Sequence, residues 1–488
     1  MTKDLILVLD AGTTSTRAIA FDGQGAMLAS HQLPITQHYP QPGWVEHDAA
    51  EIWRLSRDCL LAVADSVGAA RFAGIGITNQ RETIVFWDKN SGEPLAPAIV
   101  WQDRRTAAIC AGLKAHEPQV QATTGLLLDP YFSGTKIRWA LENWPAVAAA
   151  EQAGRLLVGT VESWLIWKLS AGTTHVTDAT NASRTLLMNL ATCEWDAAMC
   201  SLLGVPQAIL PRITDCAGPL ASTDVLGMTV PITGAAGDQQ AAAIGQGCLT
   251  PGALKATYGT GCFLLAHAGT MPPTSNNRLL ATMAFRLGGT AHYALEGAIF
   301  TAGAAVQWLR DGLGIIASSA ESEALAQSVP DSGGVVFVPA LAGLGAPFWA
   351  PDARGLISGI TGGTSRAHIV RAALEAQGQQ TADLVEALAK DGVPAARLRV
   401  DGGMVANNWL CQDLADSLGV PVDRPQVIET TAMGAAMLAG VGAGLFPSLE
   451  SAVAAMWKAD RSFTPALPAA DRAARRTAWA SAIGKVLA

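Results

Sequence analysis

The stretch LVLDAGTTSTRAIAFD, residues 7–22, places polar side chains between two apolar runs. Three consecutive hydroxyl residues stand at its centre: Thr13, Thr14 and Ser15. Gly12 allows the backbone an unusual angle there, so hydroxyl and N–H groups can converge on one anion, and Arg17 can add charge. A plain hairpin with an aspartate bonded to its own turn fits the same residues. The stretch alone leaves both interpretations open.

Asp10 ends the first apolar run and would lie beside any phosphate bound at this turn. A buried carboxylate is repelled by phosphate unless a divalent cation lies between them. The aspartate, the hydroxyl groups and the arginine therefore indicate binding of a magnesium nucleotide, with Asp10 as the metal ligand. The P-loop motif GxxxxGK[ST], which joins a strand to a helix, is absent from the sequence. Any phosphate site at this turn has another geometry.

Two later glycine-rich turns could complete a nucleotide site. Residues 259–261, GTG, lie between two strand-like runs, and residues 401–403, DGG, precede a predicted helix whose N–H groups could face a ligand. Either turn alone is a weak signal. Three such turns in two halves are a stronger one, because a nucleotide needs phosphate contacts and a base pocket together.

Charged and amide side chains interrupt two apolar segments. In GITNQRETIVFW, Arg81 and Glu82 are adjacent, and adjacent strand residues point to opposite faces, so both could serve one small ligand only from an irregular backbone. In AAGDQQAAA, Asp238 is followed by Gln239 and Gln240, a set suited to hydroxyl groups. On spacing alone, a helix capped by Asp238 with solvated glutamines is the favoured interpretation of the second segment.

The elements that must position these residues follow from hydrophobic periodicity. Three strand-like runs at 5–9, 18–21 and 27–33, separated by turns, predict an antiparallel meander, and 49–67 has helical spacing. FAGIGITNQ and RETIVFWD predict a strand, a turn and a strand. The strand and turn pattern returns in LKATYGTGCFLLAH, at 254–267. Two hydroxyl-rich hairpins, one in each half, suggest two related lobes that close on one ligand.

The later segments alternate strand and helix, which predicts an α/β fold. VVFVPAL and LRVDGG predict strands, and MVANNWLCQDLADSL and VIETTAMGAAMLAG predict helices. The segment 206–231 is rich in Pro, Gly, Ser and Thr and suggests a lobe boundary nearby. We take the N-terminal lobe as residues 1–245 and the C-terminal lobe as residues 246–488.

Composition limits the partners of the chain. Its 488 residues are half hydrophobic and 15% charged, with a net charge of −8 and scattered basic residues, which argues against nucleic acid as a partner. Eight cysteines without metal-binding spacing fit buried thiols in a reducing compartment, and the sequence starts without a signal peptide pattern. The apolar segment 430–448 favours a buried helix over a membrane span because Ala and Gly dominate it. These features predict a cytoplasmic protein without a membrane partner.

Several motifs resemble those of one known family. NQRET, DPYFSGTK, AAGDQQAAA, YGTGCF, RVDGGMVANNWL and TTAMGAAMLAG occur in that family's order between about residue 8 and residue 440. The combination of three of these motifs is specific for that family: NQRET, DPYFSGTK and YGTGCF. The chain resembles the FGGY carbohydrate kinases, in particular the members that act on glycerol. This resemblance implies an α/β fold of two actin-like, or ribonuclease H-like, ATPase lobes with a central cleft.

The resemblance also implies roles for single residues. The hydroxyl groups of a polyol would be held by Arg81, Glu82, Tyr131, Asp238 and Gln239. Its carbon edge would pack on Trp101 and Phe263. The nucleotide phosphates would be bound from the first lobe by Thr13, Thr14, Ser15 and Arg17. The nucleotide site would be completed from the second lobe by Thr260, Gly303, Gln307, Gly403 and Asn407.

The implied reaction is ATP-dependent phosphorylation of glycerol to sn-glycerol 3-phosphate in glycerol catabolism. Asp238 would be the general base that accepts the proton of the terminal hydroxyl as its oxygen attacks the γ-phosphorus in line. Glycerol and ATP or ADP are then the small-molecule partners, and Mg²⁺, held through Asp10, is the cofactor. The family commonly forms homo-oligomers, so a dimer or a tetramer is expected.

Two alternatives remain at this point. One is a kinase for another short polyol or sugar, such as erythritol or dihydroxyacetone, although the complete polyol-binding set argues against it. The other is a non-enzymatic, actin-like protein, which would have no need for Arg81 and Asp238 together.

The sequence also departs from the family pattern. Ala11 replaces a usual glutamine, and Gln379 replaces a frequent tyrosine. Some relatives bind fructose 1,6-bisphosphate through an arginine-containing loop, but the matching segment 221–234 has no Arg or Lys, so this inhibition is expected to be absent.

Overall fold

The first strands form the predicted antiparallel meander. In the computed structural model, which describes residues 3–488, β1 (Leu5–Ala11) pairs with β2 (Ser15–Asp22), and β2 pairs with β3 (Met27–Pro34). β5 (Phe72–Asn79) runs parallel to β1, and β14 (Val230–Gly237) runs parallel to β5. With β13 (Ala217–Thr223) at the edge, the order of this first sheet is β13-β14-β5-β1-β2-β3.

The second sheet repeats this arrangement. Its strands are β15 (Ala253–Tyr258), β16 (Cys262–Gly269), β17 (Leu280–Leu287), β18 (Thr290–Ile299), β21 (Arg397–Asp401), β22 (Val422–Pro425) and β23 (Ala459–Phe463). β15, β16 and β18 are successive antiparallel neighbours, while β21 and β22 continue parallel to β15. Both sheets therefore contain three antiparallel strands, the first of which is extended by two parallel strands, as the repeated hairpin pattern suggested; in the second sheet β17 lies between β16 and β18 in the chain and pairs at the outer side of β18.

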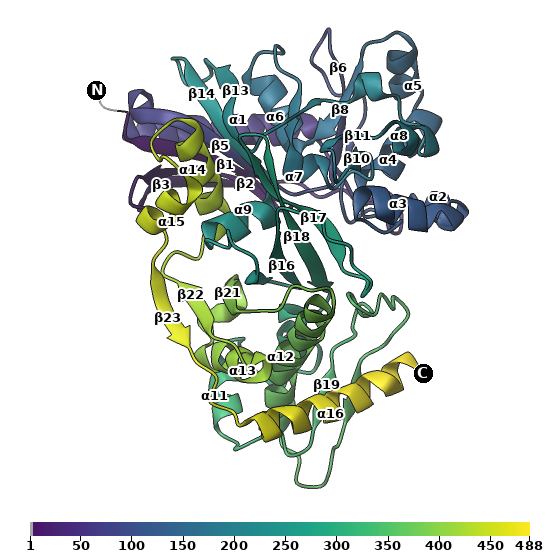
Figure 1. The fold of residues 1–488 in the computed structure, drawn as a ribbon, viewed down its shortest axis with the longest axis vertical. Helices are drawn as coiled ribbons and strands as arrows, with labels where there is room; N and C mark the ends of the chain where they lie inside the picture. Colours follow the sequence, from purple (N-terminus) through teal and green to yellow (C-terminus); the bar gives the residue numbers. More distant parts are fainter. Residues whose placement is uncertain (1–2) are drawn as a thin grey trace.

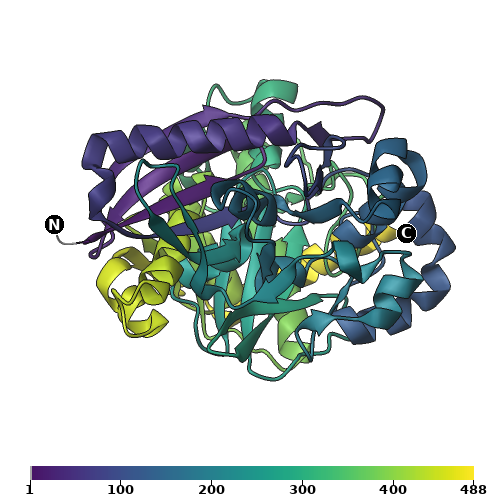
Figure 2. The same cartoon turned by 90° about the horizontal axis from the view of Figure 1, so that it is seen from above.

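Helices cover both faces of the first sheet because successive residues of its central strands are all apolar. Leu5, Leu7 and Leu9 pack in one cluster with α1 (Ala49–Val67), which begins and ends where the sequence predicts. Figure 2 shows this helix, in purple, lying across the purple strands of the first sheet. Ile6 and Val8 face the other way, into a cluster with α14 (Thr430–Gly442). Figure 1 shows α14 and α15 (Leu449–Met456), late in the chain, beside the first strands.

The helices of the C-terminal half pack mainly on the second sheet. α12 (Arg366–Lys390) and α13 (Asn408–Leu418) share a core with its strands, and α16 (Ala469–Leu487) packs on the small β19 (Val336–Val338) and β20 (Leu356–Ser358) pair. Two shorter helices complete this half: α10 (Gly303–Gln307) and α11 (Glu321–Gln327).

A smaller sheet lies beside the first one, in the blue region of Figure 1. Its order is β4 (Glu46–His47), β7 (Ala98–Ile99), β6 (Ile84–Asp88) and β8 (Leu156–Thr160). It packs with α3 (Glu117–Thr124), α4 (Ser133–Asn143), α5 (Pro145–Gln152) and α8 (Ala197–Leu202). α2 (Ala107–Gly112) precedes α3 in the chain. The predicted strands β5 and β6 therefore both form, but they belong to different sheets.

The remaining elements connect this region to the two large sheets. They are α6 (Val161–Leu169), α7 (Ala179–Ala182), the parallel pair β9 (Val176–Asp178) and β12 (Arg212–Thr214), and the hairpin β10 (Met188–Asn189) and β11 (Glu194–Trp195).

The boundary suggested between residues 206 and 231 is wrong. β13 lies within that segment, β14 begins inside it, and both strands belong to the first sheet. The many Pro, Gly, Ser and Thr residues there form turns around an edge strand. The chain passes to the second sheet after α9 (Asp238–Gly245), which packs on α14 and on strands of both sheets. The division at residues 245 and 246 stays a prediction.

All eight cysteines are buried as free thiols, as predicted. Segment 430–448 contains α14, a buried helix. Among residues 3–488, no helix is both long and apolar enough to cross a membrane.

Candidate active site

Arg81 and Glu82 follow β5, where the chain leaves the first sheet. Glu82 has φ of 62°, a left-handed conformation that is unusual for a residue with a side chain, so the backbone is irregular as the sequence predicts. Both side chains are buried, at 2% and 1% exposure. The Nε of Arg81 lies 3.3 Å from Oδ1 of Asp238. The two interrupted segments of the sequence therefore meet in space.

Asp238 is the first residue of α9, directly after β14. The helix cap is Gly237 rather than Asp238, whose carboxylate accepts only the adjacent N–H of Gln239, at 2.7 Å. Gln240 is fully buried and donates to the carbonyl oxygen of Met283 at 3.1 Å, so it is not solvated. The capped-helix interpretation is wrong on both points, and the Asp238 side chain keeps 32% exposure.

The surroundings of Asp238 favour a base. Burial raises the pKa of its carboxyl above the ordinary value, although the positive charges of Arg81 and Lys255 act in the opposite direction. A raised pKa makes a carboxylate a stronger proton acceptor. Lys255 is fully buried on β15 and donates to Oε1 of Gln239 at 2.6 Å, which fixes that amide beside Asp238.

Three aromatic side chains meet near these polar groups. The ring of Trp101 lies edge-on to Tyr131 and to Phe263, with centroids 5.7 Å and 6.5 Å apart. The Tyr131 hydroxyl accepts from Nη2 of Arg81 at 3.4 Å, and the indole N–H of Trp101 donates to the Thr13 hydroxyl at 2.9 Å. The expected polyol contacts are therefore neighbours, and Trp101 connects them to the first turn.

A buried ion network stands behind Arg81 and Glu82. Glu296 on β18 accepts from Nη1 and Nη2 of Arg81, at 2.5 Å and 3.1 Å. Arg184 donates to Glu82 at 2.6 Å and to Glu296 at 3.0 Å. Burial would raise the pKa of Glu296, but Arg184 and Arg81 bring it down to about 2, so it is ionised at neutral pH.

The first turn is a tight hairpin between β1 and β2. The N–H of Gly12 donates to the carbonyl oxygen of Ser15 at 2.9 Å, and Arg17 on β2 pairs with Asp10 on β1 at 3.2 Å. Arg17 also pairs with Glu429, the residue before α14. Burial raises the pKa of Asp10 to about 6 despite the opposing charge of Arg17, and the nearby Asp238 and Glu429 add to the rise.

The donor set near Asp10 fits a hydrated magnesium ion bound with a nucleotide. Within residues 3–488 there is no group of three or more His, Cys, Asp or Glu side chains that could hold a metal. Mg²⁺ in kinases keeps several waters and takes one or two carboxylates together with substrate phosphates. Asp10 retains partial exposure, so its carboxylate is accessible for that role.

Thr260, Gly303 and Gly403, which are expected to bind the nucleotide from the second half, lie close together. The carbonyl oxygen of Thr260 accepts from the N–H groups of Ala302 and Ala304, and the N–H of Gly303 donates to Gly259. A Cβ at Gly303 would lie 3.5 Å from the side chain of Met404, which directly follows Gly403. Gln307 ends the short α10 on the surface, and Asn407 caps α13.

The chain matches the FGGY family of carbohydrate kinases over most of its length. Residues 5–245 match the family's N-terminal domain, and residues 254–443 match its C-terminal domain. The chain belongs to this family.

Individual relatives of this FGGY kinase include glycerol kinases. Those of Aromatoleum aromaticum and Rhodospirillum rubrum are both 53% identical to it, covering 98% and 99% of this chain and 98% of each relative. The crystal structure of Plasmodium falciparum glycerol kinase with ADP superposes with a TM-score of 0.95 at 35% identity, covering 100% of this chain and 99% of that one. A xylulose kinase from Rhodospirillum rubrum gives 0.88 at 26%, covering 99% of each chain. The fold of this FGGY kinase is therefore the two-domain actin-like ATPase fold.

A second buried network supports the backbone of the site. The N–H of Gly237, directly before Asp238, donates to the Thr180 hydroxyl at 2.9 Å, and Thr180 is itself bonded to Asp178. Asn79, the last residue of β5, donates to Glu162 at 3.0 Å. These bonds support the ends of β14 and β5, from which Asp238 and Arg81 extend.

Sequence analysis did not single out several side chains of this FGGY kinase site. They are Glu296, Arg184, Lys255, Thr180, Asp178 and Glu162. Glu296 and Lys255 are charges inside apolar strands, the signal that did identify Arg81 and Glu82. Gln379 stands where relatives often have tyrosine, and the structure explains this residue in part. Its side-chain oxygen accepts a hydrogen bond from Arg476 at 3.2 Å, which connects α12 with α16.

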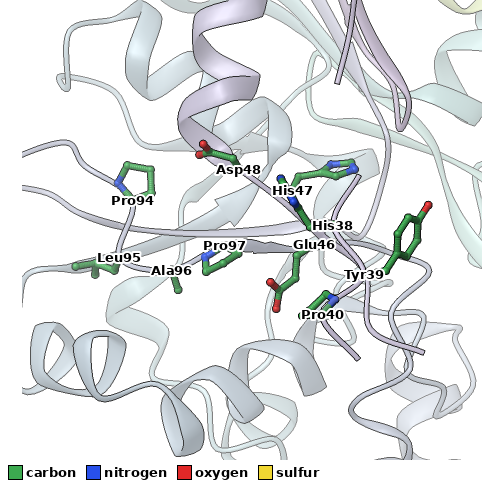
Figure 3. Close-up of a pocket in the computed structure, with 10 residues that line it drawn as sticks. All are labelled: His38, Tyr39, Pro40, Glu46, His47, Asp48, Pro94, Leu95, Ala96 and Pro97. Carbon is green, nitrogen blue, oxygen red and sulfur yellow. The ribbon is translucent and has the colours of Figure 1, made fainter. Parts of the chain in front are cut away.

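A separate pocket of about 670 Å³ lies beside the small sheet (Figure 3). Tyr39, His47 and the prolines 94 and 97 are among its lining residues, and none of the predicted site residues lines it. His47 contacts the amide of Gln80 at 3.2 Å, and that amide donates to the carbonyl oxygen of Gly12. The pocket is therefore connected to the first turn through the buried side chains of His47 and Gln80.

Proposed function

We propose that this FGGY kinase catalyses ATP-dependent phosphorylation of glycerol to sn-glycerol 3-phosphate, in glycerol catabolism. The observation that carries this proposal is the meeting of Arg81 and Asp238, at 3.3 Å, at a point reached by both large sheets. The full-length relatives named glycerol kinase support the choice of substrate.

In this proposal Asp238 is the general base. It accepts the proton of one terminal hydroxyl while that oxygen attacks the γ-phosphorus of ATP in line with the leaving oxygen. Its partly exposed carboxylate accepts only one short backbone hydrogen bond, so it has capacity for a substrate hydroxyl. Arg81 keeps the carboxylate oriented from one side.

The other polyol contacts divide by chemistry. Arg81, Tyr131 and Gln239 offer donors, and Glu82 offers acceptors, so the hydroxyl groups of glycerol can each find a fixed partner. The rings of Trp101 and Phe263 cover its carbon edge. A molecule without one hydroxyl would leave a buried polar side chain unpaired, which is the physical basis of selectivity here.

For the nucleotide, the proposal uses the two turns and the helix ends. The hydroxyl groups of Thr13, Thr14 and Ser15 and the guanidinium of Arg17 bind phosphate oxygens from one side. Thr260, Gly303, Gln307, Gly403 and Asn407 bind the nucleotide from the other. Mg²⁺ bound with ATP, through Asp10 and water, would offset negative charge on the phosphate oxygens.

Phosphorylation of another short polyol, such as erythritol or dihydroxyacetone, is not favoured. The glycerol kinases reported above cover the whole chain at about half identity, and the complete set Arg81, Glu82, Trp101, Tyr131 and Phe263 is present.

The proposal is tested by measuring ADP release with Mg-ATP and separate acceptors: glycerol, dihydroxyacetone, erythritol, xylulose and none. We expect strong preference for glycerol. Preference for a longer polyol would contradict the substrate assignment. Equal rates without an acceptor would contradict kinase activity altogether.

We further propose that the enzyme works in the cytoplasm as a homodimer or homotetramer. Eight buried free thiols fit a reducing compartment. Light scattering coupled to gel filtration measures the mass, and a monomer under assay conditions would contradict the oligomer.

A further inference from the structure

Glu296 reaches the proposed polyol site from the second sheet. It lies on β18, whereas Arg81 and Glu82 follow β5 of the first sheet. Its two carboxylate oxygens accept hydrogen bonds from the two terminal nitrogens of Arg81, at 2.5 Å and 3.1 Å. Both side chains are at most 2% exposed. This paired geometry fixes the plane of a guanidinium as well as its position.

Arg184 extends the same arrangement to Glu82. Its Nε donates to Oε1 of Glu82 at 2.6 Å, and its Nη2 donates to Oε1 of Glu296 at 3.0 Å. Arg184 and Glu82 are buried as completely as Arg81 and Glu296. Two arginines and two carboxylates thus balance each other inside the protein, in a network with no net charge.

Without Glu296, the guanidinium of Arg81 would have other partners. Its Nε already lies 3.3 Å from Asp238 and 3.9 Å from Glu82. A long side chain with several rotatable bonds would turn toward these carboxylates, which the proposed reaction needs for the polyol. By holding the terminal nitrogens of Arg81, Glu296 keeps it in one orientation and limits its pairing with Asp238.

We propose that Glu296 is a positioning residue for the polyol: from the second sheet it sets the orientation of Arg81 and, through Arg184, that of Glu82. Glu296 itself makes no contact with the polyol in this scheme. The inference rests on the proposed function, because that function assigns Arg81 and Glu82 to the polyol hydroxyls.

The test begins with Glu296→Gln, which removes the charge and keeps the shape. We expect KM for glycerol to rise by about 10- to 100-fold, the scale of a hydrogen bond to a charged group, while KM for ATP changes less than about two-fold. An equal change in both KM values, or no change in either, would overturn the proposal.

A double-mutant cycle tests whether Glu296 acts through Arg81. Arg81→Ala alone should raise KM for glycerol, and Glu296→Gln added to it should raise KM by a smaller factor than it does in the native chain, because only the route through Arg184 to Glu82 then remains. Independent, multiplying effects would overturn the proposal. Glu296→Asp keeps the negative charge but moves it away from Arg81, because the side chain is shorter. We expect its KM for glycerol to lie between those of the native chain and Glu296→Gln. This variant replaces Glu296→Gln in the test if the glutamine variant folds poorly.

Asp383→Asn is the matched structural control. Asp383 on α12 pairs with Arg476 of α16 at 2.6 Å, so the variant also breaks an ion pair, a partly buried one outside the polyol site. It should lower the melting temperature without changing KM for glycerol. A rise in KM like that of Glu296→Gln would overturn the proposal. If the native chain prefers another acceptor, the proposed function fails, and the cycle is then measured with that acceptor.

Discussion

Asp238 combines a raised pKa with two neighbouring positive charges. Arg81 and Lys255 lower its pKa, yet burial outweighs them. The cations are themselves occupied, Arg81 by Glu296 and Lys255 by Gln239. Because each cation has another partner, neither is committed to the Asp238 carboxylate. The carboxylate therefore remains available to accept a substrate proton.

Asp238→Asn tests this carboxylate. The amide keeps the size and the hydrogen bond to Gln239, but it cannot accept a proton. We expect glycerol binding to remain measurable by calorimetry and kcat to fall by about 100-fold or more, the usual scale for a general base. Near-native turnover of the asparagine variant would exclude the role. Circular dichroism is the control, because it shows whether the variant is still folded.

At the scale of single residues, the sequence indicates functional side chains where a charged residue interrupts an apolar run. Arg81 and Glu82 were recognised because charges interrupt apolar strands, and the left-handed backbone at Glu82 follows from the need to aim both at one place. Sequence reasoning preferred Asp238 as a cap, because spacing does not reveal that the glycine before it takes that position. Pairing partners such as Arg184 give no sequence signal, since their burial depends on segments far away in the chain.

The contact between α9 and α14 depends on glycines. A Cβ at Gly434 of α14 would lie 1.8 Å from the carbonyl oxygen of Ala241 in α9, and one at Gly245 would lie 2.0 Å from that of Thr430. The two helix backbones therefore touch directly. Because α9 begins with Asp238, this close approach also sets the position of the proposed base.

Gly434→Ala should consequently disturb both stability and catalysis. Overpacking typically costs about 1–3 kcal/mol, and a clash with backbone lies at the upper end of that range. We expect a melting temperature several degrees lower and a reduced kcat. Gly112→Ala is the control: nothing lies within 4 Å of its added Cβ in α2, and it should leave both values nearly unchanged. Equal behaviour of the two variants would contradict this account.

The elements themselves were largely predictable. The meander and the β15–β16 hairpin follow from short apolar runs separated by turn residues, and α1 follows from a period of 3.6 residues. The pairing of the strands was not predictable, because an apolar run does not indicate which sheet the strand joins. β5 and β6 are separated by a few residues in the chain, yet Glu82 marks the point where it changes sheet.

Across the whole molecule, buried acids couple stability to pH. Burial, followed by the charge of Asp178, raises the pKa of Glu162 to about 8, and burial raises those of Asp413 and Asp10 to about 7 and 6. Between pH 5 and 8 the folded protein therefore holds protons that the unfolded chain has released. The contribution of these acids to the free energy of unfolding falls as pH rises through this window, whereas His47, His175 and His267, whose pKa values burial lowers to about 4, contribute in the opposite direction at its acidic end.

Glu162→Gln should weaken this dependence. Each coupled proton contributes about 1.4 kcal/mol per pH unit, and the glutamine cannot titrate. Urea unfolding at pH 6, 7 and 8 should show that the midpoint of the native chain, relative to that of the variant, falls as pH rises. Glu142→Gln, at a half-exposed ion pair, is the control and should retain the native slope. Identical slopes for all three proteins would contradict the assignment.

The two-lobed plan was predictable from the recurrence of a hydroxyl-rich hairpin, but the boundary was not. Turn-rich composition between residues 206 and 231 resembles a linker, although it surrounds an edge strand. Composition reports exposed turns and cannot tell a linker from the rim of a sheet. The effect of Ala11, the oligomeric state and the response to fructose 1,6-bisphosphate stay predictions.

The return of α14 to the first sheet has a consequence for biosynthesis. Ile6 and Val8 belong to the first strand that leaves the ribosome, yet the helix that covers their face ends at Gly442. The N-terminal half must therefore wait, with an apolar face uncovered, until nearly the whole chain has been translated. Such late contacts between distant segments slow folding and extend the period of exposure to aggregation. Chaperone protection during translation matters most for this face.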